Sequence, residues 1–367
     1  MAEFMGHIRV PVGRLHMELT NICNFSCEFC PDSRMTRPRG IMPMELAKSI
    51  LDDVGRTKLC RLVLFHVMGE PTLYPHLTEV VAYASNRGIR TCLTTNGSRL
   101  DGKLLDEIIH AGAGQIIISL QTPEEDTFAL RGARGVRFED YAARIVSVVK
   151  SFLTGDEKTT LTLSFLSSPL RRLIIPVYRE VSIADTSADL KGHLTAWAKR
   201  ILEGSVSERR YDDVLKQISR TKSYRENLVR LSERVTFQTR ILGDWAIHFD
   251  VRNVNAHFGY CPAIQDNFGI LYNGDYVFCC TDYDGKTTTC NYRDASLREY
   301  LSSEMVQGLV REFNRLRVTH PHCKQCLGDR TILNATVRQI GSVAYFKLFR
   351  KNATSASAYE MSQGGAS

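Results

Sequence analysis

Three cysteines near the start of the chain are spaced to present three thiolates to one metal site. Cys23, Cys27 and Cys30 form the pattern C-x3-C-x2-C. A closed structural zinc site takes four protein ligands, and so does a fully coordinated [4Fe–4S] cluster. A cluster held by only three cysteines keeps one iron open to another molecule. The motif therefore predicts a reactive metal site, and the alternative interpretation is a set of buried thiols.

A second set of cysteines lies in the last third of the chain, around a predicted β-hairpin. Asn273-Gly274 separates two alternating apolar stretches, which is a strong hairpin signal. The hairpin would bring a cysteine ahead of its first strand close to a cysteine at the end of its second strand. A later C-x2-C pair closes the site. The candidate ligands are Cys261, one of the adjacent Cys279 and Cys280, Cys323 and Cys326.

Four thiolates would leave this second site with no position open to substrate. The spacing alone is equally compatible with a tetrahedral zinc ion and a fully ligated [4Fe–4S] cluster. Neighbouring residues of a strand point to opposite faces, so Cys279 and Cys280 cannot both face the metal. Cys60 and Cys92 fall in other predicted strands, where we expect them to be buried core thiols.

Strands and helices alternate along the first half of the chain. Repeated strand–helix units predict a parallel sheet with helices outside it. Five such units, with a sixth strand at either 235–239 or 246–251, favour an α/β fold with an incomplete (β/α)6 barrel. The expected strands are 15–19, 61–65, 90–95, 115–120 and 159–166, and the expected helices are 43–55, 76–86, 101–110 and 138–152.

Polar or glycine-containing segments follow the first four predicted strands. They are the cysteine motif, Gly69-Glu70-Pro71, Asn96-Gly97 and Ser119-Leu120-Gln121. Ligands of parallel α/β sheets bind at the carboxyl ends of the strands. We therefore expect all four segments to converge on one edge of the barrel.

The composition is that of a globular protein, and the chain is long enough for two domains. Of its 367 residues, 43% are hydrophobic and 24% are charged. No apolar run approaches the roughly 18–20 residues of a membrane span, and the first 14 residues lack the apolar core of a secretory signal. Eleven cysteines without an export signal predict a cytoplasmic protein that binds metal.

The net charge of +7 is modest, and the basic residues are scattered. Such a charge could help to dock an acidic electron donor, but the sequence has no nucleic-acid signature. We expect an N-terminal extension at 1–12, the barrel at 13–254 with a charged helical insertion at about 185–233, a small cysteine-rich hairpin and helix domain at 255–335, and a C-terminal helix and tail at 336–367, disordered from 353.

The first cysteine motif, with aromatic Phe29 before its last cysteine, resembles the radical S-adenosylmethionine (SAM) superfamily. Met68-Gly69-Glu70-Pro71 is similar to the Gly-Gly-Glu segment of that family, with Met68 in place of the first glycine. Thr95-Asn96-Gly97 and Ser119-Leu120-Gln121 also match, although many members have Asp where Gln121 stands. The resemblance covers roughly residues 13–170.

This resemblance implies a [4Fe–4S] cluster on Cys23, Cys27 and Cys30, with SAM on its open iron. The reduced cluster then cleaves SAM to a 5′-deoxyadenosyl radical, which takes a hydrogen atom from substrate. A flavodoxin or ferredoxin-type protein would supply the electron. The implied cofactor contacts are backbone near Phe29 for the adenine, Gly69 and Glu70 for the methionine ammonium, Asn96 at a strand end, and Ser119 and Gln121 for the ribose or carboxylate.

The stretch from Gly274 to Cys280 resembles the auxiliary-cluster segment called SPASM, or its shortened twitch form, which follows radical SAM barrels. Full SPASM domains carry more cysteines and two clusters. The resemblance here implies one auxiliary [4Fe–4S] cluster with Cys279 as a ligand, and leaves Cys280 and Cys290 spare.

Resemblance to twitch-type sugar dehydrogenases implies oxidation of a sugar or cyclitol alcohol to a ketone, with the auxiliary cluster as electron acceptor. Alternatives are a peptide maturase that forms crosslinks or thioethers, an epimerase, and a non-catalytic iron–sulfur or zinc module. The resemblance to sugar dehydrogenases favours a small molecule over a peptide as substrate. The candidate catalytic residues are His66, Arg131 and Asp250, and further candidates are Arg134, His248 and Arg252.

Overall fold

A nine-stranded sheet forms the centre of the computed structural model, which describes residues 3–155, 158–168, 181–205, 207–242 and 253–349. Its strand order is β11-β10-β3-β4-β5-β6-β7-β9-β8, and every pair from β10 to β9 is parallel. The strands are β3 (Val12–Met17), β4 (Cys60–Leu64), β5 (Thr91–Thr95), β6 (Gln115–Gln121), β7 (Thr160–Ser167), β8 (Asn227–Arg230), β9 (Val235–Ile241), β10 (Asn267–Ile270) and β11 (Tyr276–Val277).

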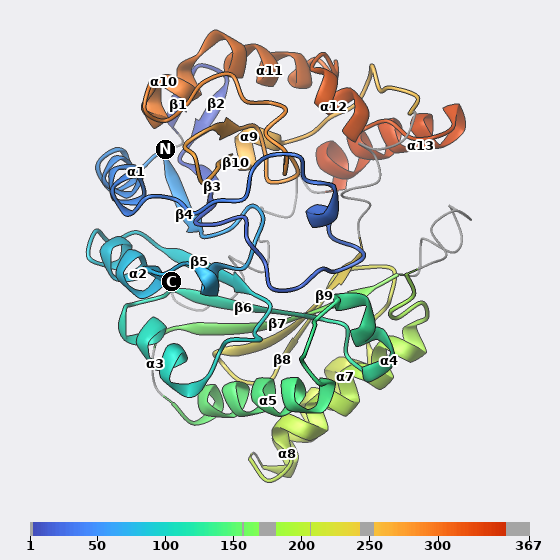
Figure 1. The fold of residues 1–367 in the computed structure, drawn as a ribbon. Helices are drawn as coiled ribbons and strands as arrows, with labels where there is room; N and C mark the ends of the chain where they lie inside the picture. The colour runs from blue at the N-terminus through green and yellow to red at the C-terminus, as the bar shows by residue number, and fades with distance from the viewer. Residues whose placement is uncertain (1–2, 156–157, 169–180, 206, 243–252, 350–367) are drawn as a thin grey trace.

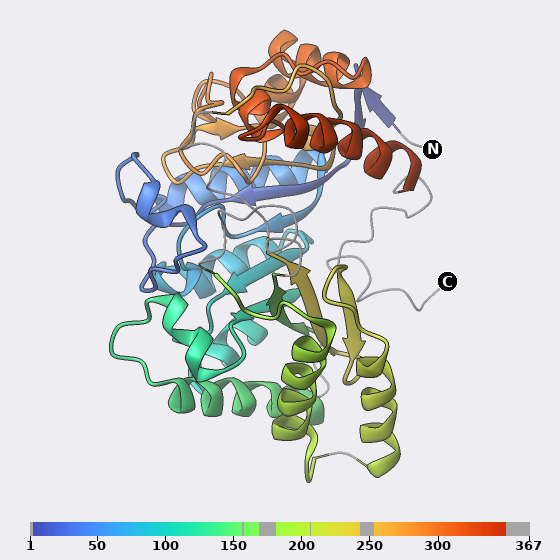
Figure 2. The ribbon, with the colours of Figure 1, turned by 90° about the vertical axis from the view of Figure 1, so that its right-hand side faces the viewer.

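Helices cover the outer side of this curved sheet, and the C-terminal segment lies at the end of the sheet formed by β10 and β11 (Figures 1 and 2). A separate ribbon of β1 (Glu3–Met5) and β2 (Ile8–Val10) precedes the sheet. The helices are α1 (Met44–Thr57), α2 (Leu77–Ser85), α3 (Gly102–His110), α4 (Glu125–Phe128), α5 (Phe138–Thr154), α7 (Ser187–Leu202), α8 (Glu208–Ser219), α9 (Ala263–Asp266), α10 (Leu297–Ser302), α11 (Glu304–Asn314), α12 (Pro321–Cys326) and α13 (Ile332–Val343).

The expected pattern of alternating strands and helices is confirmed, and its physical basis is visible in the core. In α1, Leu46, Ile50 and Val54 recur at helical spacing and are all buried against the sheet. Asp101 caps α3 by accepting a hydrogen bond from the backbone N–H of Leu104 at 2.8 Å. The fold is therefore α/β with a mostly parallel sheet, as predicted.

The sixth parallel strand is β9, which begins at Val235 as the first of the two candidate segments predicts. The other candidate, 246–251, and the tail from 353 lie outside the described residues. The charged insertion contains α7 and α8, but it also ends in β8, an antiparallel partner of β9 that the sequence reading missed. With only four residues, β8 is too short to give a clear alternating pattern.

The predicted hairpin forms, and its first strand continues the sheet of the barrel. β10 and β11 pair in antiparallel register across Asn273-Gly274. β10 also pairs in parallel with β3, with Gly269 opposite His16 and Ile270 opposite Met17. The hairpin turn thus lies at the carboxyl end of β3, where the cysteine loop begins, and β11 runs back so that the N–H of Cys280 donates to the side chain of Asn267 at the start of β10, beside Arg14 of β3.

Candidate active site

The first three cysteines lie on a long loop, residues 18–42, that is pinned closed at its base. We refer to it as the cysteine loop. The Thr20 hydroxyl donates to the carbonyl of Gly40 at 2.8 Å, and the N–H of Gly40 donates to the Asn21 side chain at 2.8 Å. The N–H of Met42 returns to the carbonyl of Leu19 at 2.8 Å. These bonds fix both ends of the loop that presents the thiols.

The loop after β4 packs directly against the cysteine loop, and this contact requires glycine at position 69. Gly69 has a φ of +80°, and a Cβ there would lie 2.3 Å from the carbonyl oxygen of Thr20. The next N–H, that of Glu70, donates to the carbonyl of Ile22 at 2.8 Å. The predicted Gly-Glu segment therefore lies against the backbone just before Cys23.

Glu70 is 2% exposed and holds the ends of two strands together. Its carboxylate accepts hydrogen bonds from the N–H and hydroxyl of Thr72, the hydroxyl of Thr95 and the N–H of Asn96, at 2.6–3.0 Å. Burial raises the pKa of Glu70, and these four bonds oppose that rise. A carboxylate has about four acceptor positions. Three of these donors share Oε1 of Glu70 and one binds Oε2, so Oε2 keeps an acceptor position for a further donor.

Asn96 connects the end of β5 to the interior of the cysteine motif. Its amide donates to the side-chain oxygen of Asn24 at 2.9 Å, and the Asn24 amide donates to the Ser98 hydroxyl at 2.9 Å. Tyr141 on α5 donates to the carbonyl of Asn96 at 2.8 Å. Asn24 was not among the predicted site residues, although its position directly after Cys23 is a signal for such a contact.

Arg131 lies beneath the cysteine loop and is 1% exposed. One guanidinium nitrogen donates to the carbonyls of Ser119 and Leu120 and to the side-chain oxygen of Gln121, at 2.7–2.9 Å. The guanidinium also acts to lower the pKa of the Cys27 thiol, although burial dominates and raises it. Arg131 therefore joins the end of β6 to the cysteine motif.

The three thiols of the motif are half-buried, because they lie on one loop at the carboxyl end of the sheet. Burial raises the pKa of Cys23 to about 11 and that of Cys30 to about 12, and neighbouring thiols of the motif add to both shifts. Thiolate ligands need a compensating cation. Within the described ranges, no three His, Cys, Asp or Glu side chains already stand in the geometry of a bound metal ion. The donor set, three neighbouring thiols on one loop, suits a cluster with one open iron.

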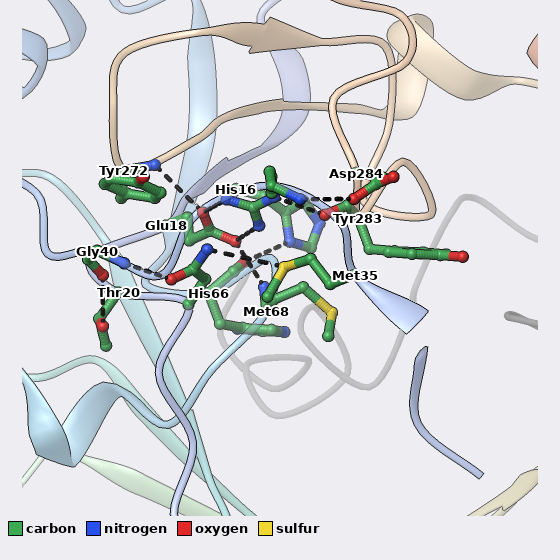
Figure 3. Close-up of polar contacts among 12 residues, drawn as sticks. His16, Glu18, Thr20, Met35, Gly40, His66, Met68, Tyr272, Tyr283 and Asp284 are labelled. Carbon is green, nitrogen blue, oxygen red and sulfur yellow. Dashed lines mark hydrogen bonds and ion pairs between the residues drawn. The ribbon is translucent and has the colours of Figure 1, made fainter. Parts of the chain in front are cut away.

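Two histidines lie inside the barrel at the same edge. His16 is on β3, and its Nδ1 lies 3.1 Å from the carbonyl oxygen of His66, which follows β4 (Figure 3). The two rings meet edge to face, with centroids 5.5 Å apart. Burial lowers the pKa of His66 to about 4, with a further contribution from Arg240, so the ring is neutral at pH 7. Sequence reasoning missed His16 and Arg240.

The barrel interior is apolar deeper inside and polar near its carboxyl edge. A small buried cluster of Leu62, Leu64, Cys92 and Ile117 fills the deeper part. Cys60 is buried as well, so the prediction of two core thiols is confirmed. Phe29, at the edge, is partly buried against a separate apolar cluster of Leu166, Ile183 and Leu242.

The second cysteine set converges from three segments of the chain. Cys261 precedes α9, Cys279 follows β11, and Cys323 and Cys326 lie on α12. Burial raises the pKa of all four thiols. Cys326 adds to the rise for each of the other three, and Cys261 adds to it for Cys279 and Cys323, as expected of neighbouring thiols.

The two remaining cysteines of this region differ in their neighbours. Burial raises the pKa of Cys280 and the charges of Arg14 and Arg240 oppose that rise, while Cys280 itself adds to the rise for Cys261 and Cys279. The pKa of Cys290 responds to Thr289, Asp294 and Asp275, and no thiol contributes to it.

The structure describes only one of the four remaining predicted substrate residues, which are Arg134, His248, Asp250 and Arg252. Arg134 is exposed. Asp250, His248 and Arg252 lie outside the described residues.

Among the described residues, none of the helices combines the length and the apolar character that a membrane span requires.

Two family models match the segments that contain the two cysteine sets. Residues 17–162 match the family model described as the radical SAM superfamily, and residues 261–327 match the SPASM iron–sulfur cluster-binding domain. The first implies a [4Fe–4S] cluster and SAM, and the second implies auxiliary iron–sulfur clusters. Cys23, Cys27 and Cys30 fall in the first match, and Cys261, Cys279, Cys323 and Cys326 fall in the second.

Similar curated proteins have diverse activities. A tungsten-containing aldehyde ferredoxin oxidoreductase cofactor-modifying protein of Pyrococcus furiosus is 30% identical over 106 residues, which are 29% of this chain and 30% of that protein. An AdoMet-dependent heme synthase of Oleidesulfovibrio alaskensis is 24% identical over 292 residues, 75% of this chain and 68% of that protein. The chain spans only 29–41% of the length of the Pyrococcus protein and of two relatives from Methanosarcina barkeri.

Solved structures share the fold at low identity. Streptococcus suis SuiB bound to S-adenosylmethionine is 16% identical, with a TM-score of 0.52 over 84% of this chain and 69% of that chain. Native anSMEcpe with bound AdoMet is 16% identical, with a TM-score of 0.50 over 92% of this chain and 97% of that chain. From the two family matches and this shared fold, we conclude that the chain contains a radical SAM domain followed by an iron–sulfur cluster-binding SPASM domain.

Proposed function

We propose that this protein is a radical SAM oxidoreductase that converts an alcohol of a sugar or cyclitol to a ketone. When bound, the SAM cluster and SAM supply a 5′-deoxyadenosyl radical. The carbon that bears the alcohol loses a hydrogen atom to that radical, the hydroxyl loses a proton to the protein, and the remaining electron goes to an auxiliary cluster. The proposed ligands are Cys23, Cys27 and Cys30 for the first cluster and Cys261, Cys279, Cys323 and Cys326 for the second.

The pairing of β10 with β3 is the observation that carries this proposal. It joins the auxiliary hairpin to β3, the strand that carries His16, and Cys279 and Cys280 follow β11 beside the start of β10. An electron acceptor must be near the substrate radical to be useful, and this pairing brings the second cysteine set next to a strand of the barrel. The pairing therefore supports an oxidoreductase role.

His66 is the proposed acceptor of the hydroxyl proton. Its ring is buried and neutral at pH 7, and its Nδ1 has no hydrogen-bond partner among the residues that the structure describes. A neutral imidazole nitrogen can accept a proton from a hydroxyl within hydrogen-bond reach. Asp250 remains a proposed catalytic residue on sequence grounds alone.

The remaining predicted residues are proposed to hold SAM or the loops around it. Backbone at Phe29 and Gly69, together with Ser119, keeps its proposed role in direct contact with SAM. The side chains of Glu70, Asn96, Gln121 and Arg131 are bonded to the protein, as described above. We therefore propose that these four residues act chiefly by positioning the loops, and that Glu70 serves the methionine ammonium by ordering the carbonyls around Gly69.

Epimerisation is the second candidate, and the position of Cys280 favours it. The N–H of Cys280 donates to the side chain of Asn267 beside β3. Arg14 and Arg240 lower the pKa of this thiol against the rise caused by burial, although Cys280 also lies near Cys261 and Cys279. A thiol that faces the substrate could give a hydrogen atom to the substrate radical, and the resulting thiyl radical would be returned to the thiol by one electron from the reduced auxiliary cluster and one proton from solvent. The product would then have the mass of the substrate, and the returned hydrogen would exchange with solvent.

Anaerobic turnover with a panel of cyclitols, sugars and peptides distinguishes these reactions. Substrates deuterated at the reacting carbon should transfer deuterium to 5′-deoxyadenosine. Dehydrogenation predicts one 5′-deoxyadenosine per ketone, with the ketone from unlabelled substrate about two mass units lighter than that substrate. A product of unchanged mass that acquires deuterium from D2O would contradict dehydrogenation and support epimerisation. A crosslinked peptide as the sole product would contradict both.

A further inference from the structure

A buried ion pair within the cysteine loop, between Glu18 and Arg37, also contacts the hairpin turn and the chain that follows it, through Tyr272 and Tyr283 (Figure 3). Glu18 directly follows β3, and its side chain is fully buried, whereas the side chain of Arg37 is 11% exposed. The two guanidinium nitrogens of Arg37 donate to the two carboxylate oxygens of Glu18 at 2.6 and 2.5 Å. This two-pronged geometry fixes orientation as well as distance.

Glu18 also receives donors from two other segments. The N–H of Met68, in the loop after β4, donates to its carboxylate at 3.0 Å. The N–H of Tyr272, at the start of the hairpin turn, donates at 3.2 Å. One buried carboxylate therefore holds the cysteine loop, the Gly-Glu loop and the hairpin in register.

The other side of Arg37 contacts the chain beyond the hairpin. Its Nε donates to the carbonyl of Tyr283 at 2.7 Å. The N–H and hydroxyl of Thr36 each donate to the Asp284 carboxylate at 2.7 Å, and the N–H of Arg37 donates to it at 3.2 Å. Burial alone would raise the pKa of Asp284, but these bonds lower it overall. These hydrogen bonds thus favour the ionised form of Asp284.

Tyr283 and Asp284 belong to a compact turn, residues 279–287, which we call the auxiliary turn. It begins at Cys279, a proposed cluster ligand. Asp282 closes it, because its carboxylate accepts the backbone N–H groups of Lys286 at 2.9 Å and Thr287 at 2.7 Å. Arg37 therefore connects the loop of the first cluster with the turn that carries a ligand of the second.

The neighbourhood of the ion pair is tightly packed, which restricts how the two segments can slide. The Arg37 guanidinium lies over the ring of Tyr272 at 5.8 Å from its centre. A Cβ at Gly40 would lie 2.1 Å from a carbon of that same ring. The hairpin turn thus packs directly on the backbone of the cysteine loop.

A buried ion pair is a poor source of stability, because both charges lose their hydration and apolar side chains of similar volume are often as good. Its better-supported use is to specify one arrangement, since each charge has few other positions where it is satisfied. Neither Glu18 nor Arg37 supplies a thiol or a predicted SAM contact. Neither stability nor cofactor ligation therefore explains why this ion pair is present.

We propose that Glu18 and Arg37 are positioning residues that hold the auxiliary turn against the cysteine loop and so set the second cluster relative to the substrate radical. This inference rests on the two-cluster assignment made above. If the register is lost, SAM cleavage continues, but fewer substrate radicals deliver their electron to the auxiliary cluster. The enzyme then consumes more SAM for each product formed.

Arg37→Lys tests this role, because lysine keeps the charge but cannot span both carboxylate oxygens and the Tyr283 carbonyl. We expect unchanged iron content and SAM cleavage, and about tenfold more 5′-deoxyadenosine per product, within the usual range for outer-shell residues of metal sites. We also expect an altered electron paramagnetic resonance (EPR) spectrum of the reduced auxiliary cluster and faster hydrogen exchange at 279–287. Arg87→Lys, at the exposed ion pair with Asp52, is the matched control and should change none of these.

Unchanged EPR and hydrogen exchange in Arg37→Lys would overturn the proposal, whatever the substrate proves to be. A wild-type protein without a second cluster would instead overturn the proposed function, so the two failures are distinguishable. If Arg37→Lys does not fold, Asp284→Asn carries the test. It leaves the ion pair intact and removes the charge that binds Thr36, so the same spectral and exchange changes are expected, and their absence would equally overturn the proposal.

Discussion

Cys23→Ala is expected to abolish cleavage of SAM to 5′-deoxyadenosine. Two thiols on the cysteine loop cannot hold a [4Fe–4S] cluster with a single open iron, so SAM loses its binding position. We expect the rate to fall by at least about 10³-fold, which corresponds to about 4 kcal/mol. The measurement is anaerobic reconstitution of the variant, followed by quantification of 5′-deoxyadenosine with dithionite as reductant.

Cys290→Ala is the matched control for this experiment, because no other thiol acts on the pKa of Cys290 and it is not a proposed ligand. It should cleave SAM at the wild-type rate. SAM cleavage by Cys23→Ala at a rate near that of wild type would remove the first motif from its assigned role.

Cys279→Ala is expected to separate SAM cleavage from product formation. The variant keeps the cysteine loop intact, so 5′-deoxyadenosine should still form at a rate within about threefold of wild type. Ketone should fall by about 100-fold, the upper range for changes around a metal site, because the substrate radical loses its electron acceptor. The measurement is the ratio of ketone to 5′-deoxyadenosine in one anaerobic assay.

Cys280→Ala tests the choice between the two adjacent cysteines. If Cys279 is the ligand, Cys280→Ala should keep its full iron content and its ketone yield. Loss of about four irons from Cys280→Ala, with none lost from Cys279→Ala, would reverse the assignment. Loss of an isomerised product from Cys280→Ala, with all iron retained, would instead favour epimerisation.

The fold of the barrel could be predicted because its signals are local. β6 is a near-continuous apolar strand, buried on both faces of a parallel sheet, and α3 and α5 follow strands at the spacing of a repeated unit. The first cysteine motif is equally local, because all of its ligands lie within eight residues. Such features are set by neighbours along the chain.

The structural features that could not be predicted from the sequence depend on contacts between distant segments of the chain. The hairpin could be read from Asn273-Gly274, but its pairing with β3 joins residues about 250 positions apart and leaves no trace in either segment. Glu18 reads as one more residue at the end of a predicted strand, and Arg37 as one more basic loop residue. Their ion pair spans 19 positions of the cysteine loop, and its contacts with Met68, Tyr272 and Tyr283 exist only because this loop, the loop after β4 and the hairpin region meet in space.

The site was predicted better in its identities than in its roles. Glu70, Asn96 and Arg131 do gather around the cysteine loop, but the structure adds that their side chains are bonded to other parts of the protein. Sequence patterns identify which residues lie at a strand end. They do not say whether a side chain there faces a ligand or a neighbouring loop, because that depends on partners such as Thr95 and Asn24.

We propose that one chain carries an open cluster and a closed cluster. The most direct test of this proposal is the metal content of the wild-type protein after anaerobic reconstitution, measured together with EPR spectra recorded with and without SAM. Two [4Fe–4S] clusters predict about eight irons and eight sulfides per chain, and SAM should change the signal of only one cluster. About four irons with one tightly bound zinc would show that the second cysteine set holds zinc and that the chain has no auxiliary cluster.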